Sequence, residues 1–245
     1  GVGLAMTVFD TEDAIYWVFA GICASLAVLW MWASPYMESI RPDTKAMPWP
    51  EFVVQVQHLG KTAQSQEGAV RAFVLLLSIG SCLGLVSTFE FVLLDSMMGS
   101  SFLLGLCKLT GTIASIPAWW YVSPVMDRLG LNNMLLIGLS AAGIRLLILG
   151  LIRNPWYALI SEALSGVGGF AIAYSSMTIF AGRIVDEEMK GTAQTIIYTV
   201  FAGVGAGVAP LLGSFIVGAQ RTSGIQEMFL VMSASVAVLV VCIAT

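Results

Sequence analysis

Four ionisable residues stand inside long apolar stretches of this chain: Glu90, Lys108, Arg145 and Glu162. An ionised side chain within the hydrocarbon of a bilayer costs about 2.5–3.5 kcal/mol on insertion scales. Residues kept there at such a cost usually pair with an opposite charge or line a water-filled pathway. The chemistry they could support is the binding of a polar solute or the uptake and release of a proton.

The four residues occupy one predicted level of the membrane. Each lies seven or eight residues from a short polar connection, which at a rise of 1.5 Å per residue places it about 10–12 Å below one surface. Each helical hairpin then carries one acid and one base, Glu90 with Lys108 and Arg145 with Glu162. The sequence leaves open whether they pair within the hairpins or across the bundle. Static ion pairs, or a Lys108 that extends toward the surface, are the structural alternatives to a functional site.

Further polar residues are candidates for the wall of a cavity near this level. Gln194 and Tyr198 are four residues apart and therefore share a helix face. Tyr174 and Ser175 lie midway along another apolar stretch. Hydrogen bonds between helices would explain these residues equally well.

The elements that must position these side chains are membrane-spanning helices. Hydrophobic residues make up 58% of the chain and charged residues 11%, less than half the share in soluble domains of about 25%. A spanning helix needs roughly 20 mostly apolar residues, and helices satisfy their own backbone groups within lipid. Seven stretches qualify, at about residues 14–32, 72–98, 102–122, 134–152, 156–181, 192–217 and 228–245. The predicted fold is an all-α polytopic bundle.

Basic residues indicate how this bundle is oriented. The connections on one predicted side carry two of them, Arg153 and Arg221, and those on the other side carry seven, Arg41, Lys45, Lys61, Arg71, Arg128, Arg183 and Lys190. The excess of positive charge marks the cytosolic side. The start of the chain is then outside and its end inside. Residues 34–71, with four prolines and scattered charges, are expected to form a cytosolic linker.

Composition disfavours several other classes of protein. The net charge of -4 gives no basic surface for nucleic acid. The four cysteines lie in apolar runs without metal-ligand spacing, and His58 is the only histidine, so neither a metal site nor a cofactor is expected. An enzyme is not expected either, because the acidic run Asp186-Glu187-Glu188 is typical of a solvated loop. The expected partners are the lipid bilayer, a small polar solute and protons.

The segment Ser123-Pro124-Val125-Met126-Asp127-Arg128-Leu129-Gly130 resembles the Asp-Arg-x-Gly signature of the major facilitator superfamily, with Ser123 in place of the usual glycine. Three further segments look like its lactose-permease-like, nucleoside/sugar proton-symporter branch: Asn154-Pro155-Trp156, Glu162-Ala163-Leu164-Ser165-Gly166 and Gly191-Thr192-Ala193-Gln194. The similarity covers about residues 91–218.

This resemblance implies a division of the chain. Residues 1–33 would be the sixth helix of the superfamily fold, 34–71 the central linker, and 72–245 the C-terminal six-helix half, with an N-terminal half missing. It also implies alternating access around a midplane site. An Arg–Glu pair that matches Arg145 and Glu162 would take part in proton coupling, and Asp127, Arg128 and Gly130 would form a conformational gate.

The expected function is therefore proton-coupled secondary transport of a small polar solute. Two alternatives remain open at this point. A transport-inactive membrane scaffold would share every feature of the sequence. A seven-helix receptor-like protein would fit the span count, although Leu129-Gly130 after the Asp-Arg pair and the long proline-rich loop are unusual for one.

Overall fold

The computed structural model describes residues 68–183, 190–217 and 221–244, together with Val54 and scattered residues between Gly21 and Trp32. The chain divides into two units, Gly1–Phe52 and Val53–Thr245, and the helices discussed below all belong to the second. Most of the expected first span and of the expected linker, including His58, lies outside the described residues. So does the acidic run at residues 186–188.

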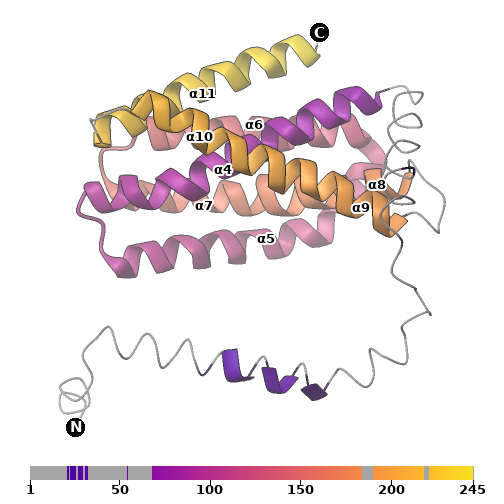
Figure 1. Cartoon of the computed structure of the whole chain (residues 1–245), viewed down its shortest axis with the longest axis horizontal. Coiled ribbons are helices and arrows are strands. Elements are labelled where there is room, and N and C mark those ends of the chain that lie inside the picture. The colour runs from indigo at the N-terminus through magenta and orange to yellow at the C-terminus, as the bar shows by residue number, and fades with distance from the viewer. Residues whose placement is uncertain are drawn as a thin grey trace. The chain divides into compact units, whose positions relative to one another are not determined.

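Six helices in the described part are long and apolar enough to cross a membrane, and they match the second to seventh predicted stretches. They lie side by side as a bundle of long rods (Figure 1). The first three are α4 (Ala69–Ser96), α5 (Ser101–Leu129) and α6 (Leu131–Leu151). The fourth joins a short 3₁₀ turn (Pro155–Tyr157), α7 (Ala158–Ser165), the π-helical segment η2 (Gly166–Tyr174) and α8 (Ser175–Arg183). The fifth joins α9 (Lys190–Tyr198), the π-helical segment η4 (Thr199–Gly205) and α10 (Ala206–Val217), and the sixth is α11 (Arg221–Ala244).

Two helices extend further than the sequence predicts. The expected loop at residues 123–133 is wrong, because α5 continues through Pro117 and Pro124 to Leu129. Proline is tolerated in membrane helices because neighbouring groups satisfy the freed backbone carbonyls. Only Gly130, with a φ of 78°, separates α5 from α6. Likewise α11 begins at Arg221, inside a stretch that the hydropathy pattern assigned to a connection.

Polar groups define two of the turns at the predicted outer side. Ser100 caps α5, and its hydroxyl accepts a hydrogen bond from the amide of Leu103 at 3.3 Å. Asn154 does the same for the fourth span, accepting from the amide of Trp156 at 3.1 Å while Pro155 occupies the first helical position. These are ordinary N-terminal caps, and they fix where Lys108 and Glu162 lie along their helices.

Small residues let the helices approach closely around the centre of the bundle. A Cβ atom on Gly166 would collide with the backbone carbonyl of Gly111, so η2 and α5 meet through two glycines. Helices α6 and α11 are held together by hydrogen bonds from side chains of α11 to backbone carbonyls. Ser233 donates to the carbonyl of Gly143 at 3.0 Å, and Gln226 donates to that of Ile152 at 2.6 Å. The result is a close-packed frame around one polar layer.

Candidate functional site

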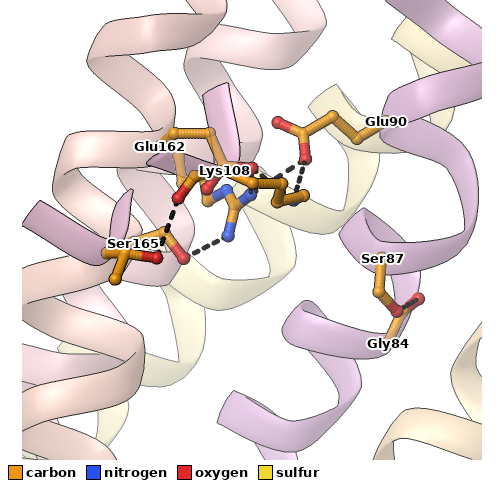
Figure 2. Close-up of polar contacts among 8 residues, drawn as sticks. Gly84, Ser87, Glu90, Lys108, Glu162 and Ser165 are labelled. Atoms are coloured by element: carbon orange, nitrogen blue, oxygen red, sulfur yellow. Dashed lines mark hydrogen bonds and ion pairs between the residues drawn. The ribbon is translucent and has the colours of Figure 1, made fainter. Parts of the chain in front are cut away.

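The four charged residues predicted at one level meet in a single cluster. Each comes from a different helix: Glu90 from α4, Lys108 from α5, Arg145 from α6 and Glu162 from α7. The side chains of Glu90, Lys108 and Glu162 point toward one another, with Lys108 between the two acids (Figure 2), and Arg145 contacts both acids as well. Pairing therefore occurs both within the hairpins and across the bundle, and we call these four residues the charge cluster.

Every base in the charge cluster contacts both acids. Lys108 Nζ lies 3.2 Å from Glu90 Oε2 and 2.5 Å from Glu162 Oε1. Arg145 Nη2 lies 3.1 Å from the same oxygen of Glu90 and 3.0 Å from the same oxygen of Glu162. One oxygen of each carboxylate thus accepts from two cations. The formal charges of the cluster, two positive and two negative, sum to zero.

The remaining polar atoms of the cluster are not all satisfied. Arg145 Nη1 donates to the hydroxyl of Ser165, one turn after Glu162. Glu90 Oε1 and Arg145 Nε are buried and have no hydrogen-bond partner among the described residues. Lys108 Nζ also lies 4.7 Å from the centre of the Phe91 ring, a cation–π contact. A buried polar atom without a hydrogen-bond partner destabilises the fold, because it has lost its hydrogen bonds to water and gained none in exchange. Glu90 Oε1 is such an atom.

Exposure separates Lys108 from the other three members. Glu90, Arg145 and Glu162 are 1%, 5% and 4% exposed, whereas half of the Lys108 side chain is exposed. Removing one partner of a buried ion pair typically costs about 3–5 kcal/mol, because the other charge is left uncompensated. Loss of any one of these partners should therefore destabilise the packing of α4, α6 and α7. Lys108 is the member that a solute could reach.

A cavity of about 530 Å³ adjoins the cluster. Lys108, Arg145 and Glu162 form its charged end, and Trp119 contributes an aromatic wall. The other lining residues are small, hydroxylated or apolar: Gly80, Leu83, Ser87, Gly111, Thr112, Ser115, Ser165, Gly166, Phe201, Ala202 and Ala206. Its volume falls within the range of small-molecule binding sites, about 300–1,000 Å³.

Two of the predicted cavity candidates lie beside the aromatic wall. The Tyr174 ring is 5.8 Å from that of Trp119 and 6.5 Å from that of Tyr198, each pair edge to face. Ser175 is buried and Gln194 is half-buried. Neither these two nor the tyrosines line the cavity, as far as the described residues show.

Sequence reasoning missed Ser165 and Trp119. Ser165 follows Glu162 by three residues, which places both on one helix face. Trp119 follows Lys108 by eleven residues, about three turns along α5. Both residues therefore share a helix face with a charged residue, and helical spacing is the signal in the sequence that points to them.

The residues expected to form a conformational gate are far from the cluster. Asp127 and Arg128 are exposed in the last turn of α5, and Gly130 follows directly. Lys108 and Arg128 are twenty residues apart on the same helix, about 30 Å.

Within the described ranges, no group of three or more His, Cys, Asp or Glu side chains is arranged to hold a metal ion.

Comparison with known proteins places this bundle in a family. The family model described as the MFS_1 like family matches residues 3–231. The uncharacterised MFS-type transporters YhhS of Escherichia coli strain K12 and of Shigella flexneri are each 30% identical over 152 residues. That match takes in 60% of this chain and 36% of each relative's length, so the chain corresponds to only part of them. No solved structure matches the chain at a significant level.

The family match covers well over half of the chain, and it agrees with the predicted resemblance at the level of the superfamily. The six apolar spans agree with it as well. This chain is therefore an integral, multi-pass membrane protein that belongs to the MFS_1 like family of the major facilitator superfamily.

Proposed function

We propose that the protein is a proton-coupled secondary transporter of a small polar solute, and that the charge cluster is its coupling site. The observation that carries this proposal is the position of the cluster. Lys108, Arg145 and Glu162 belong to a buried ion network and also form the end wall of a cavity. A solute in that cavity would compete directly for the hydrogen bonds that hold the network together.

Proton coupling would follow because the two bases share one carboxylate oxygen of each acid. Because one oxygen of each acid accepts from both bases, neutralising either acid weakens two ion pairs at once. Weaker pairs between α4, α5, α6 and α7 would let these helices shift against one another. Such a shift is what alternating access around a central site requires.

The domain organisation is part of the same proposal. Residues 1–33 would supply the last helix of an N-terminal half, 34–71 the cytosolic linker and 72–245 the C-terminal half. The missing N-terminal half would close the cavity from the opposite side. The proposal includes the lactose-permease-like, nucleoside/sugar proton-symporter branch, which the motifs around Asp127, Asn154 and Glu162 support.

The test measures whether protons enter liposomes together with a transported solute. The complete protein would be reconstituted in liposomes that enclose a pH-sensitive dye, and uridine, lactose or gluconate would be added outside. We expect one of these solutes to acidify the lumen as it enters. Glu162→Gln and Arg145→Ala should abolish the acidification.

Matched controls are available near the outer end of α4 and in the turn that follows α6. Asp95→Asn and Arg153→Gln each remove a charge from an exposed position outside the cluster, and they should retain the signal. Size-exclusion chromatography would show that each variant is folded. Solute uptake unaffected by both Glu162→Gln and Arg145→Ala would refute the coupling role of the cluster.

A further inference from the structure

The two acids of the charge cluster differ in their surroundings. Glu90 is 1% exposed, does not line the cavity, and has a buried oxygen, Oε1, without a hydrogen-bond partner among the described residues. Glu162 is 4% exposed and lines the cavity. Water stabilises an ionised carboxylate, whereas an apolar surrounding disfavours it. Glu90 is therefore the acid of the cluster that protein encloses most completely.

Protonation of Glu90 would weaken its two ion pairs without removing their hydrogen bonds. A proton on Oε1 occupies an atom that has no hydrogen-bond partner among the described residues, while Oε2 can still accept from Lys108 and Arg145. Glu162 likewise makes both of its contacts through one oxygen, Oε1, and they include the shortest of the network, to Lys108 at 2.5 Å. Glu90 makes the longer contacts, at 3.2 and 3.1 Å, so a change of its charge disturbs the network less.

The charged groups that contact Glu90 are those of the cluster: Lys108 from α5, Arg145 from α6 and, through them, Glu162 from α7. The buried thiol of Cys107 also lies on α5. Of the other segments packed against α4, η4 and α10 carry no titratable side chain. The described titratable groups of η2 and α11, Tyr174, Glu227 and Cys242, are exposed.

A proton on Glu90 changes the charge balance at the cavity. The ionised cluster is neutral, with two cations against two anions, and a neutral Glu90 leaves one positive charge uncompensated. That charge is most accessible at Lys108, which is half-exposed on the cavity wall. Its ammonium has three donors, of which two serve Glu90 and Glu162, so one remains for another acceptor. A carboxylate anion supplies both the charge and the acceptor.

The hydroxyls on the cavity wall indicate what the rest of such an anion should carry. Ser87 donates to the carbonyl of Gly84 at 2.9 Å, Thr112 to that of Lys108 at 3.0 Å, and Ser115 to that of Thr112 at 2.7 Å. Each hydroxyl donates its hydrogen to a backbone carbonyl of its own helix, so it can only accept hydrogen bonds from a ligand. A ligand with several hydroxyl donors would complement this wall.

We propose that Glu90 is the proton site, and that its protonation makes Lys108 the binding site for a small polyhydroxylated carboxylate. This inference rests on the proposed function and assigns its substrate class. The bound anion restores electrical neutrality, so proton and anion each favour the binding of the other. Such reciprocity is required of any thermodynamic coupling between two sites.

The test compares three ligands that share the hexitol chain and differ only at one terminal group: gluconate, glucitol and glucamine. Binding to the purified complete protein would be measured by calorimetry at acid and at neutral pH. Proton uptake would be followed in weak buffer with an indicator dye. We expect gluconate to bind at least about tenfold more tightly than glucitol or glucamine at acid pH. Binding should take up about one proton per gluconate at neutral pH.

Two substitutions separate the roles of the acid and the base. Glu90→Gln imitates the protonated acid and should bind gluconate equally at both pH values, without proton uptake. Lys108→Gln should lose gluconate binding and Lys108→Arg should keep it. Because Lys108→Gln leaves an unbalanced charge, the double variant Glu90→Gln/Lys108→Gln serves as the folded control and should also fail to bind. Asp95→Asn should behave as the unmodified protein.

The outcomes distinguish this inference from the function it rests on. Preference for glucitol or glucamine, no binding of any of the three, or proton uptake that persists in Glu90→Gln would overturn the inference. Transport of a neutral solute coupled to protons would leave the proposed function intact. Tight gluconate binding with no proton-driven uptake would support the anion site while refuting transport.

Discussion

Arg145 Nη2 donates to Glu90 Oε2 across 3.1 Å, although the two residues are 55 positions apart in the chain and lie on different helices. The same nitrogen donates to Glu162 at 3.0 Å. A guanidinium is planar, carries five donors and stays charged, so it can hold two carboxylates and the Ser165 hydroxyl at once. Arg145 is therefore the fixed centre of the charge cluster, and Lys108 is its accessible edge.

Loss of Arg145 should destabilise the bundle. Arg145→Ala leaves two buried acids with Lys108 as their only base, and we expect a loss of about 3–5 kcal/mol in the free energy of unfolding. Chemical unfolding in detergent, followed by tryptophan fluorescence, measures it. The charge-balanced variant Arg145→Met/Glu162→Gln should recover most of the loss. Equal destabilisation in both variants would mean that packing, and not charge, holds these helices.

A water-filled cavity beside Lys108 predicts a pattern of thiol labelling. In a cysteine-free background, Thr112→Cys should react with a membrane-impermeant methanethiosulfonate, because Thr112 is exposed on the cavity wall. Leu139→Cys should remain unmodified, since Leu139 is fully buried in the core. Mass spectrometry of the labelled protein reads the result. Equal reaction at both positions would argue against a defined aqueous cavity.

The glycine contact between η2 and α5 should tolerate no side chain. Gly166→Ala places a Cβ against the backbone of Gly111, so the helices must separate, at an expected cost of about 1–3 kcal/mol. Gly105→Ala is the control on α5, because its Cβ would meet no atom within 4 Å. That change should be neutral or stabilising, since alanine favours helix by about 0.5–1 kcal/mol. Comparing the unfolding midpoints of the two variants tests this: the midpoint should fall for Gly166→Ala and should not fall for Gly105→Ala.

Gly130 should be sensitive to substitution for a different reason. Nothing lies within 4 Å of a Cβ built there, yet its φ of 78° and ψ of 163° belong to a region that glycine alone adopts readily. Gly130→Ala should therefore cost about 1–3 kcal/mol through backbone strain. Differential scanning fluorimetry, with Gly105→Ala as reference, tests this expectation. If α5 and α6 fused into a continuous helix in the variant, proteolysis between them would decrease while the midpoint stayed unchanged.

Hydropathy and charge predicted most of the fold. Residues 69–96, 131–151 and 190–217 are helical close to the predicted limits, because a lipid environment leaves helices as the solution for single apolar segments. The predicted helix ends were wrong where residues typical of a connection are helical because of their packing in the bundle. Pro124 in α5 and the polar start of α11 are typical of connections, yet both are helical once neighbouring helices supply contacts.

The sequence by itself determined that Glu90, Lys108, Arg145 and Glu162 occupy a common level, because depth in a membrane follows from residue counts along each helix. It left their partners open, since pairing depends on how each helix is rotated and on which helices are neighbours. Only the tertiary structure decided that both bases contact both acids, that Glu90 Oε1 has no described partner, and that Lys108 faces the cavity. Rotation is set by packing against other helices, such as the contact between Gly111 and Gly166, and the spacing along a single helix does not specify these partners.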